Sequence, residues 1–213
     1  MPPGRPPPSP AQLRIHAAAL QWFAENGTTR ISVSQLAHAA GVARGTIYNN
    51  IEDCERLFNE VATQLVIEME QHLEPLFDGS DDPAWLLAAG VLHYLRRAHE
   101  EPAWGRFLSR FGLSSSSLQA LWTGSPLRVL QAGLANGRFA VREEQLVSVL
   151  GLVGGAALAA MLNVLDGQRG WRDAGADTVE LVLVALGVVR EEARALSRME
   201  LDRLPALAGR APS

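Results

Sequence analysis

Residues 31–50 constrain the fold most strongly, because they carry the start and stop signals of two short helices in close succession. Ser32 is a favourable N-cap residue, and Gln35 follows three positions later, as in a capping box. Gly41 ends the first of these helices, since glycine tolerates the backbone angles of a tight turn. Two short helices joined by a glycine turn, after a longer first helix, are typical of a helix-turn-helix.

The rest of the chain also shows helical rather than strand periodicity. Leu and Ala, which favour helices, dominate its apolar residues, and no useful run of strand alternation or internal repeat is present. We therefore predict an all-α fold of about nine helices, with a three-helix helix-turn-helix domain before a larger helical domain. The helices are expected over residues 13–26, 33–40, 44–50, 53–69, 83–95, 102–111, 118–136 with a break at 124–126, 142–165 and 178–197.

Three segments are expected along the chain. Residues 1–10 are proline-rich and are predicted to form a disordered arm. Residues 11–52 would form the helix-turn-helix domain, and residues 53–213 the larger domain. The start of the chain lacks the apolar run of a signal peptide, so we expect a cytoplasmic protein.

The charge distribution separates these segments. The whole chain has a net charge of −4, but every one of its 19 basic residues is arginine, and the part up to Glu52 is mildly basic. Arginine suits forked contacts to phosphate and guanine. The single cysteine excludes an internal disulfide.

One stretch, 147–165, has no charged residue and is nearly long enough to cross a membrane. It contains Ser148 and Asn163, is rich in glycine and alanine, and has no flanking cationic or aromatic belt. We therefore interpret it as a helix buried in a core or in a subunit interface, and expect no membrane association.

Residues 14–57 resemble the TetR/AcrR family of repressors. The matching text is RIHAAALQWFAENG at 14–27, ISVSQLA at 31–37, AGVARGTIY at 40–48 and then Leu57. The resemblance implies a dimeric, ligand-responsive repressor that binds a palindromic DNA operator, with the helix around residues 44–50 in the major groove. It also implies an effector pocket and a dimer interface among the C-terminal helices.

The resemblance assigns the DNA contacts residue by residue. Arg44 would reach base edges or phosphate, Gly45 would let the backbone approach the duplex, and Tyr48 would place its hydroxyl on a phosphate. The full set of expected DNA-binding residues is Ser32, Ser34, Gln35, Arg44, Gly45, Thr46, Tyr48, Asn49 and Asn50.

The chain departs from the family pattern beside these positions. Asn49 and Asn50 stand where aromatic or histidine residues are usual; they suit adenine recognition, but at least one is expected to face solvent or end the helix. Cys54 replaces a usual phosphate-binding lysine, which should weaken nonspecific affinity. Ala43 replaces a serine cap, at a cost of about 1 kcal/mol.

The expected dimer interface lies on the helices over 142–165 and 178–197. It consists of small and apolar residues, namely Gly151, Gly155, Leu158, Leu162, Leu181, Val184 and Val188. The expected effector is a small hydrophobic or aromatic molecule. The candidate ligand-binding residues are Trp85, His93, Tyr94, Trp104, Phe107, Phe111, Trp122, Met161 and Asn163.

Other functions have weaker support. The five histidines are scattered and no catalytic or metal-binding motif occurs, so we expect no enzyme activity, no cofactor and no metal. A helical protein-interaction adaptor that has lost DNA binding is the alternative, because the lysine is missing and the basic charge is weak. Cys54 as a redox switch is a further hypothesis, set against a plain small residue in the first turn of a helix.

Overall fold

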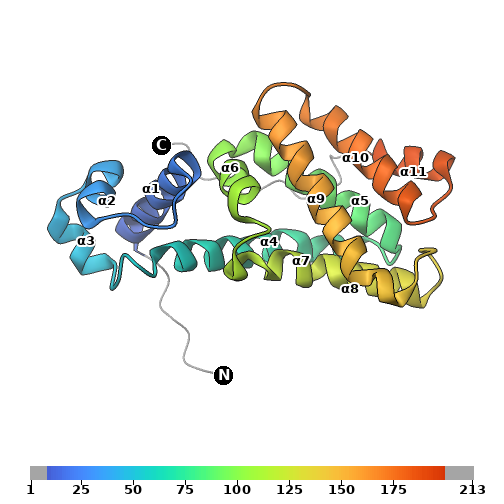
Figure 1. Ribbon diagram of the computed structural model, residues 1–213, viewed down its shortest axis with the longest axis horizontal. Coiled ribbons are helices and arrows are strands. Elements are labelled where there is room, and N and C mark those ends of the chain that lie inside the picture. The colour runs from blue at the N-terminus through green and yellow to red at the C-terminus, as the bar shows by residue number, and fades with distance from the viewer. Residues whose placement is uncertain (1–8, 200–213) are drawn as a thin grey trace. The chain divides into compact units, whose positions relative to one another are not determined.

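The computed structural model describes residues 9–199, and these residues form helices and their connections without a strand (Figure 1). The chain divides into two compact units, with the boundary between Gln64 and Leu65. The expected all-α class is confirmed. The first unit ends twelve residues later than the predicted boundary at residue 52, because the start of the fourth helix packs with the helix-turn-helix.

The first unit contains α1 (Pro10–Asn26), α2 (Val33–Ala40), α3 (Arg44–Asn50) and the beginning of α4 (Leu57–Gly79). Its core is aromatic and aliphatic: the Phe23 and Phe58 rings meet edge to face with centroids 5.3 Å apart. Further side chains that are fully or almost fully buried in this unit are Ile15, Leu36, Ile47 and Leu57. These contacts hold α2 and α3 against α1.

Helix α1 begins earlier than expected. Ser9 is its N-cap and forms a capping box with Gln12, and Pro10 occupies the first position. Proline is favourable there, because its fixed backbone angle fits a helix and its missing N–H would be unpaired anyway. Pro10 therefore belongs to the helix and not to the predicted arm; residues 1–8 of that arm lie outside the described residues.

Helix α4 follows a turn that Asp53 holds together, since its Oδ1 accepts a hydrogen bond from the Glu55 amide at 2.8 Å. The helix proper begins at Leu57, so Asp53 stabilises the preceding turn rather than the first helical residue. Pro75 lies inside α4 and cannot donate a backbone hydrogen bond to the preceding turn.

The second unit is built around α5 (Pro83–Glu100), which packs against α6 (Pro102–Phe111), α8 (Ser125–Ala135), α9 (Leu146–Leu165) and α10 (Trp171–Ala185). Helix α9 also packs against α6, α8 and α10. The remaining elements of this unit are α7 (Ala120–Thr123), α11 (Arg190–Ser197) and two 3-10 turns, Ser116–Leu118 and Glu143–Gln145.

Two helices near the C-terminus differ from expectation. Trp171 was predicted in a loop, but it opens α10, with its ring buried in the unit. The helix expected over 178–197 is divided in two at Gly187, whose φ of +90° ends α10 as few other residues would allow. With the predicted break at residue 124, this division gives eleven α-helices over residues 9–199 instead of about nine.

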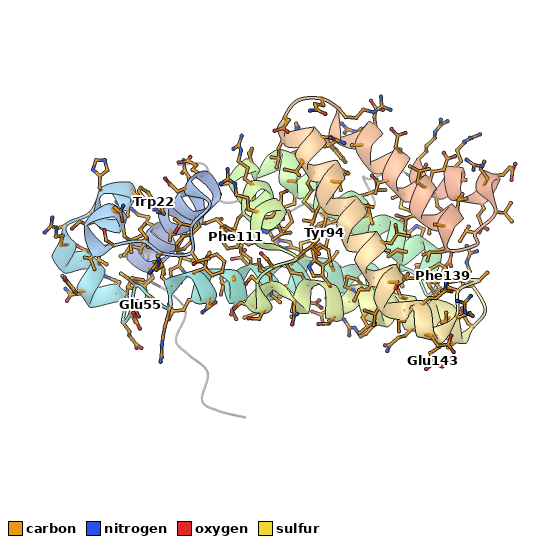
Figure 2. The ribbon with its side chains drawn as sticks, viewed as in Figure 1. Trp22, Glu55, Tyr94, Phe111, Phe139 and Glu143 are labelled. Atoms are coloured by element: carbon orange, nitrogen blue, oxygen red, sulfur yellow. The ribbon has the colours of Figure 1, made fainter. Side chains whose placement is uncertain are left out.

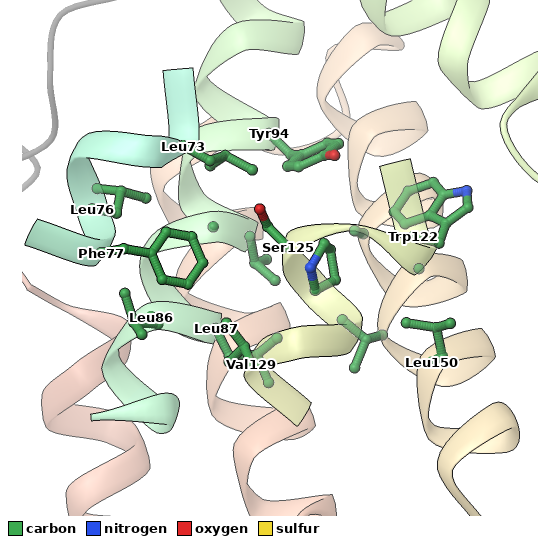
Figure 3. Close-up of a pocket in the computed structure, with 16 residues that line it drawn as sticks. Leu73, Leu76, Phe77, Leu86, Leu87, Tyr94, Trp122, Ser125, Val129 and Leu150 are labelled. Atoms are coloured by element: carbon green, nitrogen blue, oxygen red, sulfur yellow. The ribbon is translucent and has the colours of Figure 1, made fainter. Parts of the chain in front are cut away.

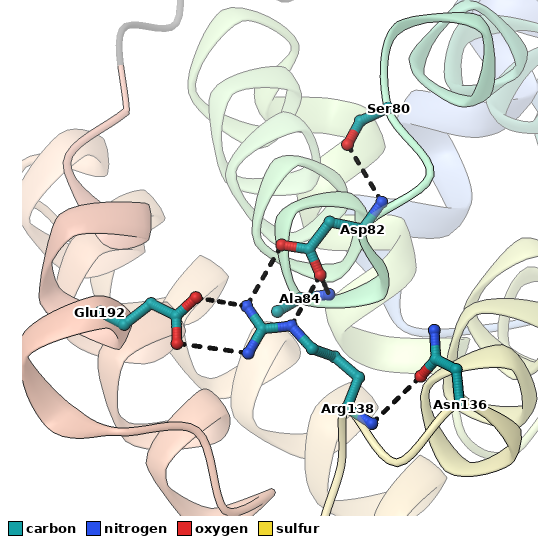
Figure 4. Close-up of polar contacts among 6 residues, drawn as sticks. All are labelled: Ser80, Asp82, Ala84, Asn136, Arg138 and Glu192. Atoms are coloured by element: carbon teal, nitrogen blue, oxygen red, sulfur yellow. Dashed lines mark hydrogen bonds and ion pairs between the residues drawn. The ribbon is translucent and has the colours of Figure 1, made fainter.

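The connection between α8 and α9 is held in place by two adjacent residues, Arg138 and Phe139. The Phe139 ring packs so closely on α8 that a Cβ at Gly133 would come within 2.1 Å of it (Figure 2). Arg138 binds two carboxylates, those of Asp82 before α5 and Glu192 in α11 (Figure 4). This arginine thus joins three segments that are far apart in the sequence.

Candidate functional site

Most of the residues expected to contact DNA lie on the exposed surface of α2 and α3. Arg44, Gly45, Tyr48 and Asn49 are exposed, and Tyr48 is 69% exposed although it is aromatic. Thr46 is half-buried, and Ile47 between them is buried. Helix α3 thus buries an aliphatic side chain and exposes a polar, aromatic and cationic face.

The N-terminus of α2 lies in the same unit and exposes Ser32, Ser34 and Gln35. The Ser32 and Gln35 side chains form the predicted capping box, in which each accepts a hydrogen bond from the other's backbone amide. Helix α3 begins at Arg44, and its N-cap residue Ala43 makes no side-chain hydrogen bond, as the missing serine predicts.

Gly45 has no packing reason to be glycine. A Cβ built on it meets nothing within 4 Å in the chain, and its φ is not positive. The space beside Gly45 is therefore open, as the expected approach of its backbone to another molecule requires.

Asn50 differs from the other expected DNA contacts. Its Oδ1 accepts from the Ser9 hydroxyl at 3.1 Å, and its Nδ2 donates to the Thr46 carbonyl at 2.8 Å. Its own carbonyl accepts from the Gln12 side chain at 3.3 Å. Asn50 thus connects the start of α1 to the end of α3, and its side-chain atoms are engaged within the chain, whereas Asn49 is exposed.

A pocket opens in the second unit between α4, α5, α7, α8 and α9 (Figure 3). The empty space amounts to about 580 Å³, including the part open to solvent. Its wall is almost wholly apolar. The lining residues are Leu73, Leu76, Phe77, Leu86, Leu87, Gly90, Val91, Tyr94, Trp122, Ser125, Pro126, Val129, Leu150, Val153, Gly154 and Ala157.

Two of the nine predicted ligand-binding residues, Tyr94 and Trp122, line this pocket, with their rings stacked at a centroid distance of 5.8 Å. Seven do not. Buried core positions elsewhere in the unit are occupied by His93, Trp104, Phe107, Phe111 and Met161. Trp85 is half-buried and Asn163 is exposed on α9. Aromatic type alone did not distinguish a pocket wall from a core.

The sequence analysis missed most of the wall. Leu73, Leu76 and Phe77 come from the last turns of α4, beyond the expected end of that helix at residue 69. Gly90 and Gly154 were missed because glycine carries no side chain that would suggest binding. Their position inside helices, where glycine is unfavourable, was the available signal.

A cluster of buried polar groups lies beside the pocket. Arg97 is almost fully buried; it donates to Glu68 of α4 at 3.0 Å, and its guanidinium lies 4.7 Å from the Trp104 ring centroid. His93 is fully buried, and neither ring nitrogen has a hydrogen-bond partner among the described residues. Burial, together with the positive charges of His72, Arg97 and Arg96, lowers the pKa of His93 to about 4. His93 is therefore neutral at physiological pH.

Helices α9 and α10 share an exposed apolar surface, which we call the α9–α10 face. It comprises Val147, Gly151, Leu152, Leu162 and Leu181. Val147 is 83% exposed and Leu181 is 65% exposed. The predicted interface residues Gly151, Leu162 and Leu181 belong to this face.

The other predicted interface residues are less exposed. Gly155 and Val184 are half-buried, whereas Leu158 and Val188 are buried in their own unit, which does not suit the interface contacts expected of them. By length and composition alone, Glu143–Leu165 is apolar enough to cross a membrane, but only 39% of its most apolar window is buried. Large apolar side chains of this helix that are exposed are Val147, Leu152 and Leu162.

Cys54 gives no support to the redox hypothesis. Burial and the neighbouring Asp53 carboxylate raise the pKa of its thiol, which disfavours the reactive thiolate.

Two family models together match most of the described chain. Residues 15–61 match the model described as bacterial regulatory proteins of the tetR family. Residues 82–199, more than half of the chain, match the model described as a tetracyclin repressor-like C-terminal domain. The chain belongs to the TetR family. The resemblance inferred from residues 14–57 is thereby confirmed.

Relatives of this TetR-family regulator agree with that assignment. It is 34% identical over 80 residues to the HTH-type transcriptional regulator AcrR of Shigella flexneri, a match that spans 36% of either chain. The crystal structure of RolR in complex with resorcinol superposes with a TM-score of 0.67 and 25% identity, covering 93% of this chain and 96% of RolR. A putative TetR-family regulator from Shewanella has the same fold, with a TM-score of 0.71, 20% identity and coverage of 84% and 98%.

Proposed function

We propose that this protein is a dimeric, cytoplasmic transcriptional repressor that binds a palindromic operator and releases it when a small hydrophobic or aromatic effector binds. The observation that carries the proposal is the exposed face of α3. Arg44, Tyr48 and Asn49 stand on a helix whose Ile47 is locked into the core of the unit.

The chemistry of that face suits double-stranded DNA. Arg44 matches the O6 and N7 acceptors of guanine, and a bidentate contact of this kind contributes about 1–3 kcal/mol of discrimination. Tyr48, Ser32 and Ser34 supply hydroxyls for phosphate oxygens, while Gly45 leaves the backbone unshielded.

The α9–α10 face supports the proposed dimer. A palindromic site is read by two related copies, and an isologous interface uses the same patch on both. Leu152, Leu162 and Leu181 form such a patch, and Gly151 allows close approach of a second helix, since nothing lies within 4 Å of its Cβ position.

The effector site is the pocket of Figure 3. Its apolar wall fits a hydrophobic ligand, and RolR, the similar solved protein, binds the small aromatic molecule resorcinol. Leu73, Leu76 and Phe77 lie on α4, the same helix that begins in the DNA-binding unit. A ligand that favours one packing of α4 would therefore shift the population of DNA-binding states.

Selection from a random double-stranded DNA library with the purified full chain tests this function. We expect enrichment of a palindrome, and a gel shift in which Arg44→Ala weakens binding about tenfold or more. Arg142→Ala, a change at an exposed arginine of the other unit, is the matched control and should leave the affinity unchanged. Failure to enrich any sequence would favour the adaptor instead.

A further inference from the structure

We propose that the pocket takes an uncharged, flat aromatic ligand, and that Gly90 sets the depth to which this ligand enters. The inference rests on the proposed effector site and specifies its chemistry. It follows from three features of the pocket wall. The wall has no residue that ionises near neutral pH, its polar atoms are hydrogen-bonded within the chain or buried, and it has a glycine at position 90 where a side chain would fill the space.

No residue that lines the pocket ionises near neutral pH, Tyr94 being the single phenol. A charged ligand would lose its hydration on entering the pocket and would find no opposite charge on the wall. Its binding is therefore strongly disfavoured. Phe77, Tyr94 and Trp122 provide the aromatic surface instead.

The polar atoms of the wall are already occupied or enclosed. The Ser125 hydroxyl donates to Glu70 at 2.7 Å and accepts from Arg128 at 2.8 Å. The Trp122 indole N–H donates to the Gly112 carbonyl at 2.7 Å. The Tyr94 hydroxyl is buried and has no hydrogen-bond partner among residues 9–199.

Two charged side chains next to the wall form an ion pair with each other. Arg128 lies over the Phe77 ring, with its guanidinium carbon 5.3 Å from the ring centroid, and is an ion-pair partner of Glu70 at 3.5 Å. The wall itself therefore offers a ligand no unpaired charge from these two residues.

Gly90 is the missing side chain. It lies inside α5 and lines the pocket, yet a Cβ placed on it meets nothing within 4 Å. At Gly154, in contrast, a Cβ would come 3.2 Å from the Trp122 ring. Because glycine is less favourable than alanine inside a helix, Gly90 gives up stability at a position where the missing side chain leaves empty volume in the pocket.

Two fluorescent probes of the same ring skeleton test the charge. N-phenyl-1-naphthylamine is neutral, and 8-anilino-1-naphthalenesulfonate carries one sulfonate. We expect the neutral probe to bind the full chain at least tenfold more tightly in a fluorescence titration. Equal binding would overturn the uncharged assignment, and loss of the sulfonate's binding in Arg128→Gln would then place its anionic group at Arg128. Lack of binding by the neutral probe would overturn the pocket assignment.

Gly90→Leu and Gly90→Ala test the depth. Gly90→Leu should weaken binding of the neutral probe at least tenfold, and Gly90→Ala should weaken it by a smaller factor. Both variants should keep the helical circular dichroism spectrum and a melting temperature no lower than that of the wild type. Unchanged probe binding by folded Gly90→Leu would overturn the role of Gly90. These titrations contain no DNA, so failure of operator binding remains a separate result.

Discussion

Asn49 and Asn50 are adjacent residues of one type with different environments. Asn49 is exposed on α3, whereas both side-chain polar atoms of Asn50 form hydrogen bonds to the chain itself. The resemblance could only mark both as unusual, because hydrogen bonding to Ser9 depends on where α1 begins.

The two asparagines therefore predict opposite outcomes. Asn50→Ala should lower the free energy of unfolding by about 1–2 kcal/mol, because it removes hydrogen bonds between α1 and α3. Asn49→Ala should leave stability within about 0.5 kcal/mol and change operator preference. Urea unfolding and repeated site selection measure the two effects; a stability loss in Asn49→Ala alone would contradict this assignment.

His93 makes stability depend on pH. Its pKa is about 4 in the folded protein against 6.5 for an unperturbed histidine, so the unfolded chain binds more protons between these values. Stability is thus lost as the pH falls from 6.5 towards 4, by roughly 3 kcal/mol from this group. His93→Leu should flatten that part of the profile measured by urea unfolding. An unchanged slope in this variant would show that another group titrates there.

At the scale of single elements, Arg138 joins three segments through Asp82 and Glu192. Its hydrogen bonds to Asp82, which outweigh the opposing effect of burial, lower the pKa of that carboxyl below its usual 3.8. Stability from the Asp82 carboxylate is therefore present above pH 3.8 and is lost as the pH falls below it.

Arg138→Gln should reduce the free energy of unfolding at pH 7 by about 1–2 kcal/mol, after allowance for solvent screening of partly exposed partners. The loss should shrink as the pH falls below 3.8, because protonation of Asp82 removes the charge that Arg138 binds. Arg142→Gln is the matched control: its ion pair with Glu144 is 3.8 Å long and exposed, so its removal should change stability little. Similar losses in both variants would contradict a special role for Arg138.

The sequence predicted helix boundaries better than buried positions, because the residues that start or stop a helix lie next to it in the sequence. The capping box at Ser32 and the turn at Gly41 lie within a few residues of the helices that they delimit, and both are present. The helical position of Trp171 and most of the pocket wall were missed, because burial of an aromatic ring or empty space beside Gly90 depends on helices far away in sequence. Local chemistry specifies where helices start and stop, while cavities arise from the packing of distant helices.

For the whole molecule, the α9–α10 face predicts the assembly. Leu181→Glu would place a charge within a dry interface, and we expect a monomer in analytical ultracentrifugation and at least tenfold weaker operator binding. Leu113→Glu changes an equally exposed leucine outside this face and should stay dimeric. A dimeric Leu181→Glu variant would exclude this face as the interface.

The exposed side of α9 has a consequence for the abundance of the protein in the cell. If a second copy covers that side, folding and association share one free energy, and the melting temperature rises with protein concentration. At low copy number, newly made chains stay unassembled and expose the apolar side of α9 to chaperones and proteases. Below a certain concentration the repressor would therefore be degraded before it can dimerise.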